Sequence, residues 1–180
     1  MRITHTLSLL ITLAGISDSA WAESPKRRGP DYSQTWCAAT ERIYFSCQIG
    51  KKTVSLCGSD QITKTEGYLQ YRFGLISKEH ELIFPSTQKH PRGQFQDDLS
   101  SSAQSFSYEI GFEREGYSYR IFIDTAARVE SFGYGVSVGR AGGIARILKC
   151  TGHIYEDRAA LWKVHDNQVI EHRQAESTLR

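Results

Sequence analysis

Four cysteines restrict the fold of this chain more than any other feature. They are Cys37, Cys47, Cys57 and Cys150. An even number of cysteines in a small exported chain predicts disulfide bridges. A structural metal site would instead place cysteines or histidines in closely spaced pairs, and the histidines of this chain are scattered. We therefore predict bridges and no metal ligands, provided that the chain leaves the cytoplasm.

The first 22 residues have the layout of a cleavable secretory signal peptide. Arg2 precedes an apolar run at residues 7–16, and Ala20 and Ala22 flank Trp21 in the Ala-x-Ala pattern of a cleavage site. The run is shorter than the roughly 20 residues of a membrane span. No cysteine follows Ala22 to carry a lipid anchor. The segment predicts a periplasmic or secreted protein, and the alternative is a buried N-terminal helix or strand.

The rest of the chain divides into three parts. Residues 23–35 are polar and contain two prolines and a glycine, which predicts a flexible leader. Residues 36–173 are expected to form a single disulfide-bonded domain, and residues 174–180 a flexible polar tail. The formal net charge of +2 gives no electrostatic case for binding nucleic acid. No second apolar stretch is long enough to span a membrane.

Apolar and polar residues alternate with a period of two through most of the domain, which predicts an all-β fold. Asp157 is expected to cap a short C-terminal helix over residues 158–164. Residues 85–102 are expected to be the longest loop. About eight strands joined by turns predict an antiparallel barrel or sandwich. The expected strands are 42–49, 52–57, 68–73, 81–84, 106–112, 117–123, 133–139 and 144–151.

The first hairpin fixes the directions of two cysteines. A turn at residues 50–51 places Cys47 opposite Val54 and Cys57 opposite Tyr44. Because side chains alternate along a strand, Cys47 would point into the core and Cys57 to the other side. A disulfide needs Cβ atoms about 4 Å apart, so the register argues against a Cys47–Cys57 bridge.

Two pairings of the cysteines then remain. One joins Cys37 to Cys57 and Cys47 to Cys150, and the other joins Cys37 to Cys47 and Cys57 to Cys150. We favour the first, because the inward Cys47 would meet the last strand. Cys57 would then hold the irregular segment around Trp36.

The residues predict no catalytic set. Nucleophilic catalysis needs an activated nucleophile, a base and an orienting group, and the cysteines are assigned to bridges. Glycosidase chemistry needs two carboxylates across a cleft. The carboxylates that could serve a hydrolytic enzyme of the envelope are Glu109, Glu113, Asp124 and Glu130. We predict no enzyme and no cofactor, with such a hydrolase as an alternative.

Residues 67–74 provide the candidate binding site. Alternation places Tyr68, Gln70 and Arg72 on one face of a strand, where an aromatic ring, an amide and a guanidinium would suit protein or glycan contact. The alternative is an ordinary strand whose Arg72 pairs with a neighbouring carboxylate. We predict a binding or inhibitor-like domain that contacts an envelope protein or cell-wall enzyme. A structural envelope module without a ligand is a further alternative.

Several segments of the sequence resemble a family of small exported bacterial proteins with no assigned function. They are Phe45-Ser46-Cys47, Val54-Ser55-Leu56-Cys57, the strand Gly67-Tyr68-Leu69-Gln70-Tyr71-Arg72-Phe73-Gly74, and Glu81-Leu82-Ile83-Phe84-Pro85. The resemblance covers residues 37–150. It implies bacterial export and supplies no activity.

A weaker resemblance is to the C-type lysozyme inhibitors, which are small periplasmic β-barrels. In that family a cysteine of the first strand is bridged to one near the last strand, as favoured here for Cys47 and Cys150. Its inhibitory loops carry a Ser-Gly-Ala-type segment and a Lys-Gly segment. This chain has only Ser101-Ser102-Ala103-Gln104 near the first and nothing at the second. The resemblance therefore implies the architecture without the inhibitory residues.

Overall fold

The computed structural model describes residues 30–126, 133–140 and 143–173. The predicted signal peptide, most of the predicted leader and the predicted tail lie outside these residues. The elements are η1 (Tyr32–Gln34), β1 (Arg42–Ile49), β2 (Lys52–Gly58), β3 (Leu69–Gly74), β4 (Leu82–Phe84), β5 (Gln96–Ser101), β6 (Ser105–Arg114), β7 (Tyr117–Ala126), β8 (Gly133–Arg140), β9 (Arg146–Lys149), β10 (Ile154–Glu156), α1 (Arg158–Asp166) and β11 (Glu171–His172).

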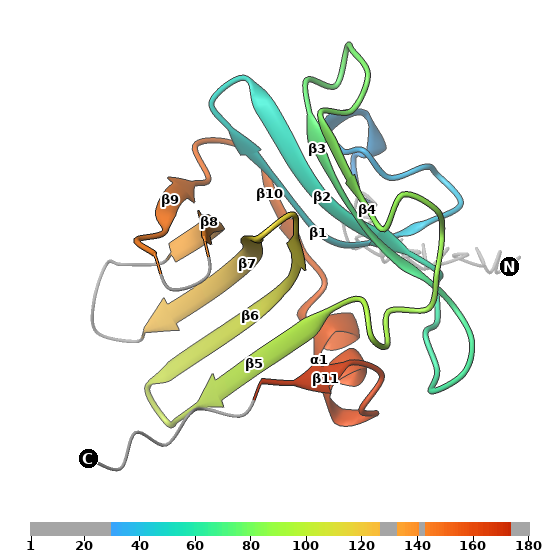
Figure 1. Cartoon of the computed structure of the whole chain (residues 1–180), viewed down its shortest axis with the longest axis vertical. Helices are drawn as coiled ribbons and strands as arrows, with labels where there is room; N and C mark the ends of the chain where they lie inside the picture. The colour runs from blue at the N-terminus through green and yellow to red at the C-terminus, as the bar shows by residue number, and fades with distance from the viewer. Residues whose placement is uncertain (1–29, 127–132, 141–142, 174–180) are drawn as a thin grey trace, which may run out of the picture.

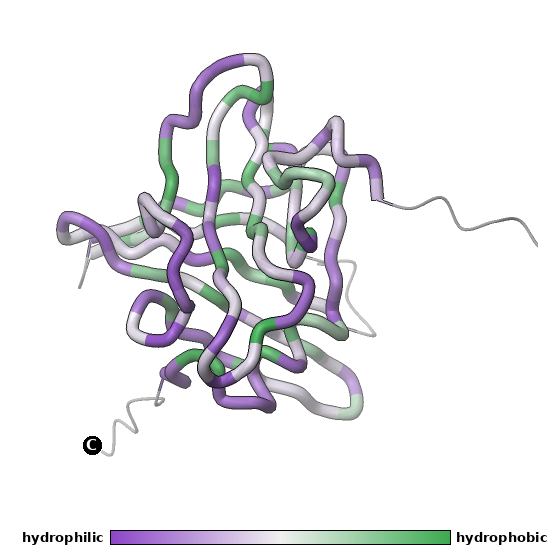
Figure 2. Tube along the Cα trace, turned by 90° about the vertical axis from the view of Figure 1, so that its right-hand side faces the viewer, coloured by the Kyte–Doolittle hydropathy of each residue, from purple (hydrophilic) through white to green (hydrophobic). Residues whose placement is uncertain are grey.

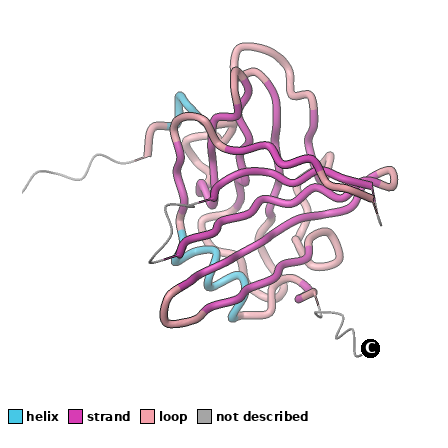
Figure 3. Tube along the Cα trace, turned by 90° about the vertical axis from the view of Figure 1, so that its left-hand side faces the viewer, coloured by secondary structure: helices cyan, strands magenta, loops and turns pink. Residues whose placement is uncertain are grey.

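The strands form two sheets. The five-stranded sheet has the order β10-β1-β2-β3-β4, and the six-stranded sheet has the order β11-β5-β6-β7-β8-β9 (Figure 1). Every pair is antiparallel except β11 with β5. The all-β prediction is confirmed, and of its two alternatives the sandwich is correct. Strands make up the body of the molecule, with α1 at one end (Figures 1 and 3).

The inner faces of the two sheets form one apolar core. In Figure 2 hydrophobic segments run along the strands through the middle of the molecule, and the loops at its edges are more hydrophilic. Aromatic rings fill the centre: Phe112 stacks on Phe84 with ring centroids 4.0 Å apart and on Tyr119 at 5.1 Å. Offset and edge-on ring pairs of this kind add to the stabilisation from burial alone.

Helix α1 closes one end of the sandwich. The carboxylate of Asp157 accepts a hydrogen bond from the amide of Ala160, so Asp157 is the N-cap that the sequence predicted. Leu161 and Val164 are buried in the core. None of the described helices is long and apolar enough to cross a membrane.

The predicted loop 85–102 is wrong in its second half, where residues 96–101 form β5. This strand pairs with β6 on one side and with β11 on the other. Its polar sequence hid the alternation, because the strand places a buried carboxylate, Asp97, at an inward position. The short strands β10 and β11 were also missed.

A β-bulge changes the register at the start of the first hairpin. Cys47 pairs with Val54 as predicted, but the register shifts between Ile43 and Phe45. Cys57 therefore pairs with Ile43, and the prediction that it faces Tyr44 is wrong. The extra residue turns Tyr44 into the main core, while Ile43 joins Cys57 in a second apolar cluster on the opposite face.

The four cysteines form the bridges Cys37–Cys57 and Cys47–Cys150, the pairing favoured from the sequence. Cys150 directly follows β9 and Cys47 lies in β1, so their bridge joins the two sheets. Cys57 is fully buried rather than exposed on the outer face, because residues 30–41 cover it. Two disulfides are consistent with an exported protein.

Candidate functional site

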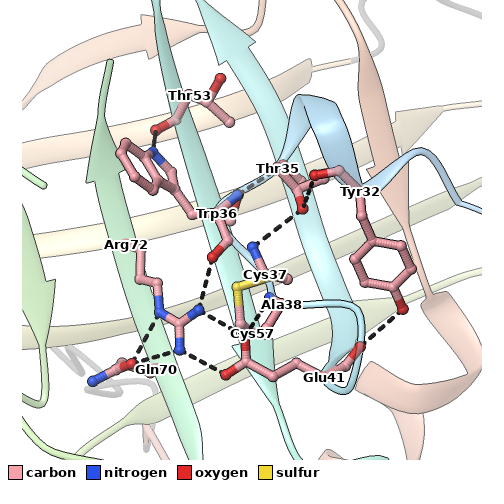
Figure 4. Close-up of a disulfide and its surroundings, with 12 residues drawn as sticks. Tyr32, Thr35, Trp36, Cys37, Ala38, Glu41, Thr53, Cys57, Gln70 and Arg72 are labelled. Carbon is pink, nitrogen blue, oxygen red and sulfur yellow. Dashed lines mark hydrogen bonds and ion pairs between the residues drawn. A yellow bond between two sulfur atoms is a disulfide. The ribbon is translucent and has the colours of Figure 1, made fainter. Parts of the chain in front are cut away.

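The predicted row of Tyr68, Gln70 and Arg72 does not lie on an exposed surface. Gln70 and Arg72 are 5% and 9% exposed. Residues 30–41, which we name the strap, lie over this face and are fixed by the Cys37–Cys57 bridge (Figure 4). The prediction that Gln70 and Arg72 are exposed is therefore wrong. Alternation shows which face of the strand a side chain occupies, but it does not show which segment covers that face.

Arg72 forms a buried ion pair with Glu41 of the strap (Figure 4). Its two terminal nitrogens donate to the two carboxylate oxygens of Glu41 at 2.7 and 2.6 Å, and one also donates to the carbonyl of Trp36 at 2.7 Å. Tyr68 donates to Glu41 at 2.7 Å, and burial and this carboxylate raise the pKa of Tyr68 to about 12.

The protonation of Glu41 follows from these contacts. Burial acts to raise the pKa of Glu41, but hydrogen bonds from Arg72, the amide of Ala38 and Tyr68 outweigh it and hold the pKa below its usual range. This is the alternative in which Arg72 pairs with a carboxylate. Arg72 and Tyr68 hold the strap against the sheet. Gln70 and Arg72 are not open to a partner, and Tyr68 is partly exposed.

A groove of about 490 Å³ lies on the solvent face of the six-stranded sheet, and we name it the outer groove. It lies over β6 to β9, on the side opposite the core. Its lining includes Ser107, Glu109, Phe122, Asp124, Ser137, Ile147 and Lys149.

Two carboxylates from neighbouring strands meet in the outer groove. In the register of β6 with β7, Glu109 lies opposite Phe122 and Ser107 lies opposite Asp124. Glu109 and Asp124 are therefore diagonal neighbours on one face, with backbones roughly 7–8 Å apart. The hydroxyl of Ser107 donates to Asp124 at 2.6 Å.

The structure thus brings together two of the four carboxylates singled out in the sequence. Glu113 is exposed on β6 beside the turn to β7, away from the groove lining. Glu130 lies outside the described residues. The pairing of Glu109 with Asp124 needed the β6–β7 register, which the hairpin pattern alone could have supplied.

Glu109 has an unusual electrostatic environment. Burial raises its pKa, the Arg173 guanidinium opposes this, and the carboxylates of Asp98 and Asp124 raise it further. The net shift is upward. A terminal nitrogen of Arg173 lies 3.8 Å from the carboxylate of Glu109. After burial, Arg173 has the largest effect on this pKa, and the upward contributions of Asp98 and Asp124 are each smaller.

The floor of the outer groove is apolar because a glycine leaves space for a ring. A Cβ at Gly135 would lie only 2.7 Å from the ring of Phe122, so the ring occupies the space above this glycine. Ile147 is 52% exposed on the neighbouring strand β9. The groove therefore offers apolar contact beside its carboxylates.

Residues 135–139 form a Gly-x-Ser-x-Gly pattern that the sequence interpretation missed. In hydrolases this pattern places a serine on a sharp turn between a strand and a helix. Here the whole pattern lies within β8, and Ser137 lines the outer groove. Its geometry is that of a flat strand and not of a nucleophile turn.

No protein family, curated protein or solved structure matches this chain. What the outer groove can bind therefore follows from its own side chains: hydroxyls, two carboxylates, the ammonium group of Lys149 and an apolar floor.

The raised pKa of Glu109 predicts a pH-dependent effect of the substitution Glu109→Gln. A carboxyl whose folded pKa is raised destabilises the fold when it ionises, so stability falls as pH rises above its ordinary value of 4.5. We expect Glu109→Gln to raise the Tm at pH 7, with a gain in the free energy of unfolding of less than ~1 kcal/mol. This gain should disappear near pH 4. Thermal unfolding at both pH values measures the effect.

The matched control is Glu113→Gln, which removes an exposed carboxylate from the same strand. It is expected to leave the Tm unchanged at both pH values. A Tm at pH 7 that falls in the Glu109→Gln variant would show that the ionised carboxylate stabilises the sheet.

Proposed function

We propose that the protein is an exported binding domain that acts by contact with a partner protein. The outer groove is the contact surface, and it takes an arginine or lysine side chain of the partner. The observation that carries the proposal is the meeting of Glu109 and Asp124 over an apolar floor, with Asp98 close enough to raise the pKa of Glu109.

Export is supported by the sequence and by the cysteines. Residues 1–22 have the pattern of a signal peptide with cleavage after Ala22, and the two disulfides suit an oxidising compartment. We propose a periplasmic or secreted location. An envelope protein or a cell-wall enzyme is then the class of partner that the domain can meet.

The charge of the groove favours a cationic group. The chain as a whole has a formal net charge of +2, so a cluster of three carboxylates on one face is a local feature. Glu109 and Asp124 repel each other, and Arg173 compensates only part of this repulsion, because the net shift of the Glu109 pKa is still upward. A guanidinium or ammonium group placed between Glu109 and Asp124 would add to that compensation. Guanidinium also matches a carboxylate in geometry through paired N–H donors.

The apolar floor favours a protein side chain over a free cation. Arginine and lysine carry a long apolar stem behind the charged group. With the charge near Glu109, the stem can lie along Phe122 and Ile147, which a metal ion or small amine could not use. The hydroxyls of Ser107 and Ser137 add polar contacts at the edges.

A titration of the isotope-labelled domain with the peptide acetyl-Gly-Arg-Gly-amide tests the proposal. We expect amide shift changes at β6, β7 and β8 around the groove, weakening as salt is added, because exposed charges are screened. The variant Glu109→Gln/Asp124→Asn is expected to lose at least ~10-fold in affinity, since hydrogen bonds to charged groups contribute about 1.5–3 kcal/mol.

The control variant Glu113→Gln/Glu115→Gln removes the same charge at the β6–β7 turn and is expected to bind as the wild type does. The control peptide acetyl-Gly-Glu-Gly-amide is expected not to bind. Shift changes that map elsewhere, or that persist in Glu109→Gln/Asp124→Asn, would rule out the groove as the contact surface.

A second candidate function is hydrolysis with Glu109 as general acid. Its support is that the two carboxyl groups have different environments: the pKa of Glu109 is raised, and Asp124 accepts a hydrogen bond from Ser107. Enzymes use such differences to make one carboxyl group an acid and its neighbour a base. Incubation with a chitooligosaccharide distinguishes the two functions. Cleavage by the wild type but not by Glu109→Gln would favour the hydrolase, and an intact substrate favours the binding domain.

A further inference from the structure

Two histidines far along the chain converge on one buried carboxylate. Asp97 is an inward residue of β5 and is completely buried. His165 comes from the last turn of α1, and His172 comes from β11, where it pairs with Asp97 in the ladder. The sequence interpretation treated the histidines as scattered residues. It had no local signal for this cluster, because Asp97 and His172 lie 75 positions apart.

The contacts of the cluster all point at Asp97. The Nδ1 atom of His172 lies 2.6 Å from one carboxylate oxygen, and the Nδ1 atom of His165 lies 3.0 Å from the other. The two imidazole rings are 4.2 Å apart. Tyr108 donates its hydroxyl to Asp97 at 3.2 Å, and burial together with the Asp97 charge raises the pKa of Tyr108 well above its usual value.

The charge of Asp97 has no fixed cation beside it. A buried carboxylate without a positive partner is costly. The side chains that contact it in the described residues are two imidazoles and a phenol. Arg173 gives Asp97 only a backbone contact, and its guanidinium lies toward Glu109. An imidazole is charged only when it is protonated, so neither histidine is a permanent cation.

We propose that Asp97, His165 and His172 bind one zinc ion. One nitrogen of each histidine and one oxygen of the carboxylate already lie within 4.8 Å of one another. Nitrogen and oxygen ligands at about 2.0–2.2 Å suit Zn²⁺, and imidazole disfavours Mg²⁺ and Ca²⁺. A small rearrangement of these side chains, in which the 2.6 Å contact between His172 and Asp97 widens, would place the three atoms around one ion, with water as the fourth ligand.

The site is open to solvent, and each histidine can leave one nitrogen unprotonated to bind the ion. The side chains of His165 and His172 are 22% and 38% exposed, so an ion reaches the carboxylate from solvent. Each neutral imidazole would carry its proton on Nε2 and use Nδ1 as the ligand atom. The ion then supplies the positive charge and ties β5, α1 and β11 together.

Titration calorimetry with zinc chloride alone tests the proposal on a chain without a histidine tag. We expect saturable 1:1 binding. We also expect the Tm to rise by roughly 5–10 °C at a hundredfold excess over Kd, because a ligand of the folded state stabilises it by mass action. The ¹⁵N chemical shifts of both imidazoles should report Nδ1 as the ligand atom.

The variant His165→Gln/His172→Gln is expected to lose the saturable binding and the Tm rise. His153→Gln, which changes an exposed histidine outside the cluster, is the matched control and should bind as the wild type does. Absence of saturable binding at 100 µM zinc, which is about the Kd of a weak site, would overturn the proposal. Equal binding by the double variant would also overturn it.

Discussion

Replacing Cys47 and Cys150 with alanine is expected to lower the free energy of unfolding by about 4–5 kcal/mol. The bridge spans 103 residues, and a cross-link over a loop of this length removes much of the conformational entropy of the unfolded chain. Such a loss is a large part of the total stability of an ordinary domain. Urea unfolding of the oxidised proteins, with m-values compared to confirm two-state behaviour, measures it.

The Cys37–Cys57 bridge is the internal comparison, because it spans only 20 residues. The same entropic account gives a cost about 1.5 kcal/mol smaller for Cys37→Ala/Cys57→Ala. Equal losses from the two pairs would show that local packing around the sulfurs, and not the length of the closed loop, determines their contribution.

The second large effect is expected from Arg72→Met. The substitution leaves the carboxylate of Glu41 buried without its cation, and the breaking of a buried ion pair costs about 3–5 kcal/mol. Adding Glu41→Gln removes the stranded charge, so the double variant should be more stable than Arg72→Met alone. Chemical unfolding of the single and double variants gives the coupling between the two residues.

Lys52→Met provides the control, because Lys52 and Glu81 form an exposed ion pair on the same sheet. Its cost should be no more than ~1 kcal/mol. A similarly small cost for Arg72→Met would mean that the strap opens readily and lets water reach Glu41.

Acid should reduce the effect of Arg72→Met. The folded-state pKa of Glu41 is lowered, so its contribution is fully present above the ordinary value of 4.5 and is lost as pH falls through the folded-state value. The stability difference between wild type and Arg72→Met is therefore expected to be largest near neutral pH and to shrink below about pH 4.5. A difference that stays constant down to pH 3 would contradict the role of the Glu41 charge.

The sequence was sufficient where local alternation is strong. The hairpin of β6 and β7 and the pairing of Cys47 with Val54 follow from a period of two and a turn, which are short-range properties. The pairing of Cys47 with Val54 argued against a Cys47–Cys57 bridge, and the inward direction of Cys47 favoured the pairing that the structure has over the other one that remained. Asp157 as a cap is likewise a local signal.

The sequence was insufficient where a distant segment decides the environment. Nothing near Arg72 shows that Glu41 will cover it, since this contact spans 31 positions. The bulge at Tyr44 moves one residue to the other face without any glycine or proline to mark it. The sequence around Asp97 predicts a loop, because the two histidines that contact it come from distant segments of the chain.

The bridge between the sheets also sets the order in which an exported chain can mature. Cys37, Cys47 and Cys57 would emerge within 21 positions of one another, while Cys150 would follow after nearly the whole domain. Cys47 can reach its native partner only after that interval, although two other thiols are close to it in sequence. Cys37 pairs with Cys57 and not with Cys47, which lies between them in the sequence. Oxidation in order of emergence would join Cys37 to Cys47, and thiol–disulfide exchange would then be needed to reach the pairing of the folded domain.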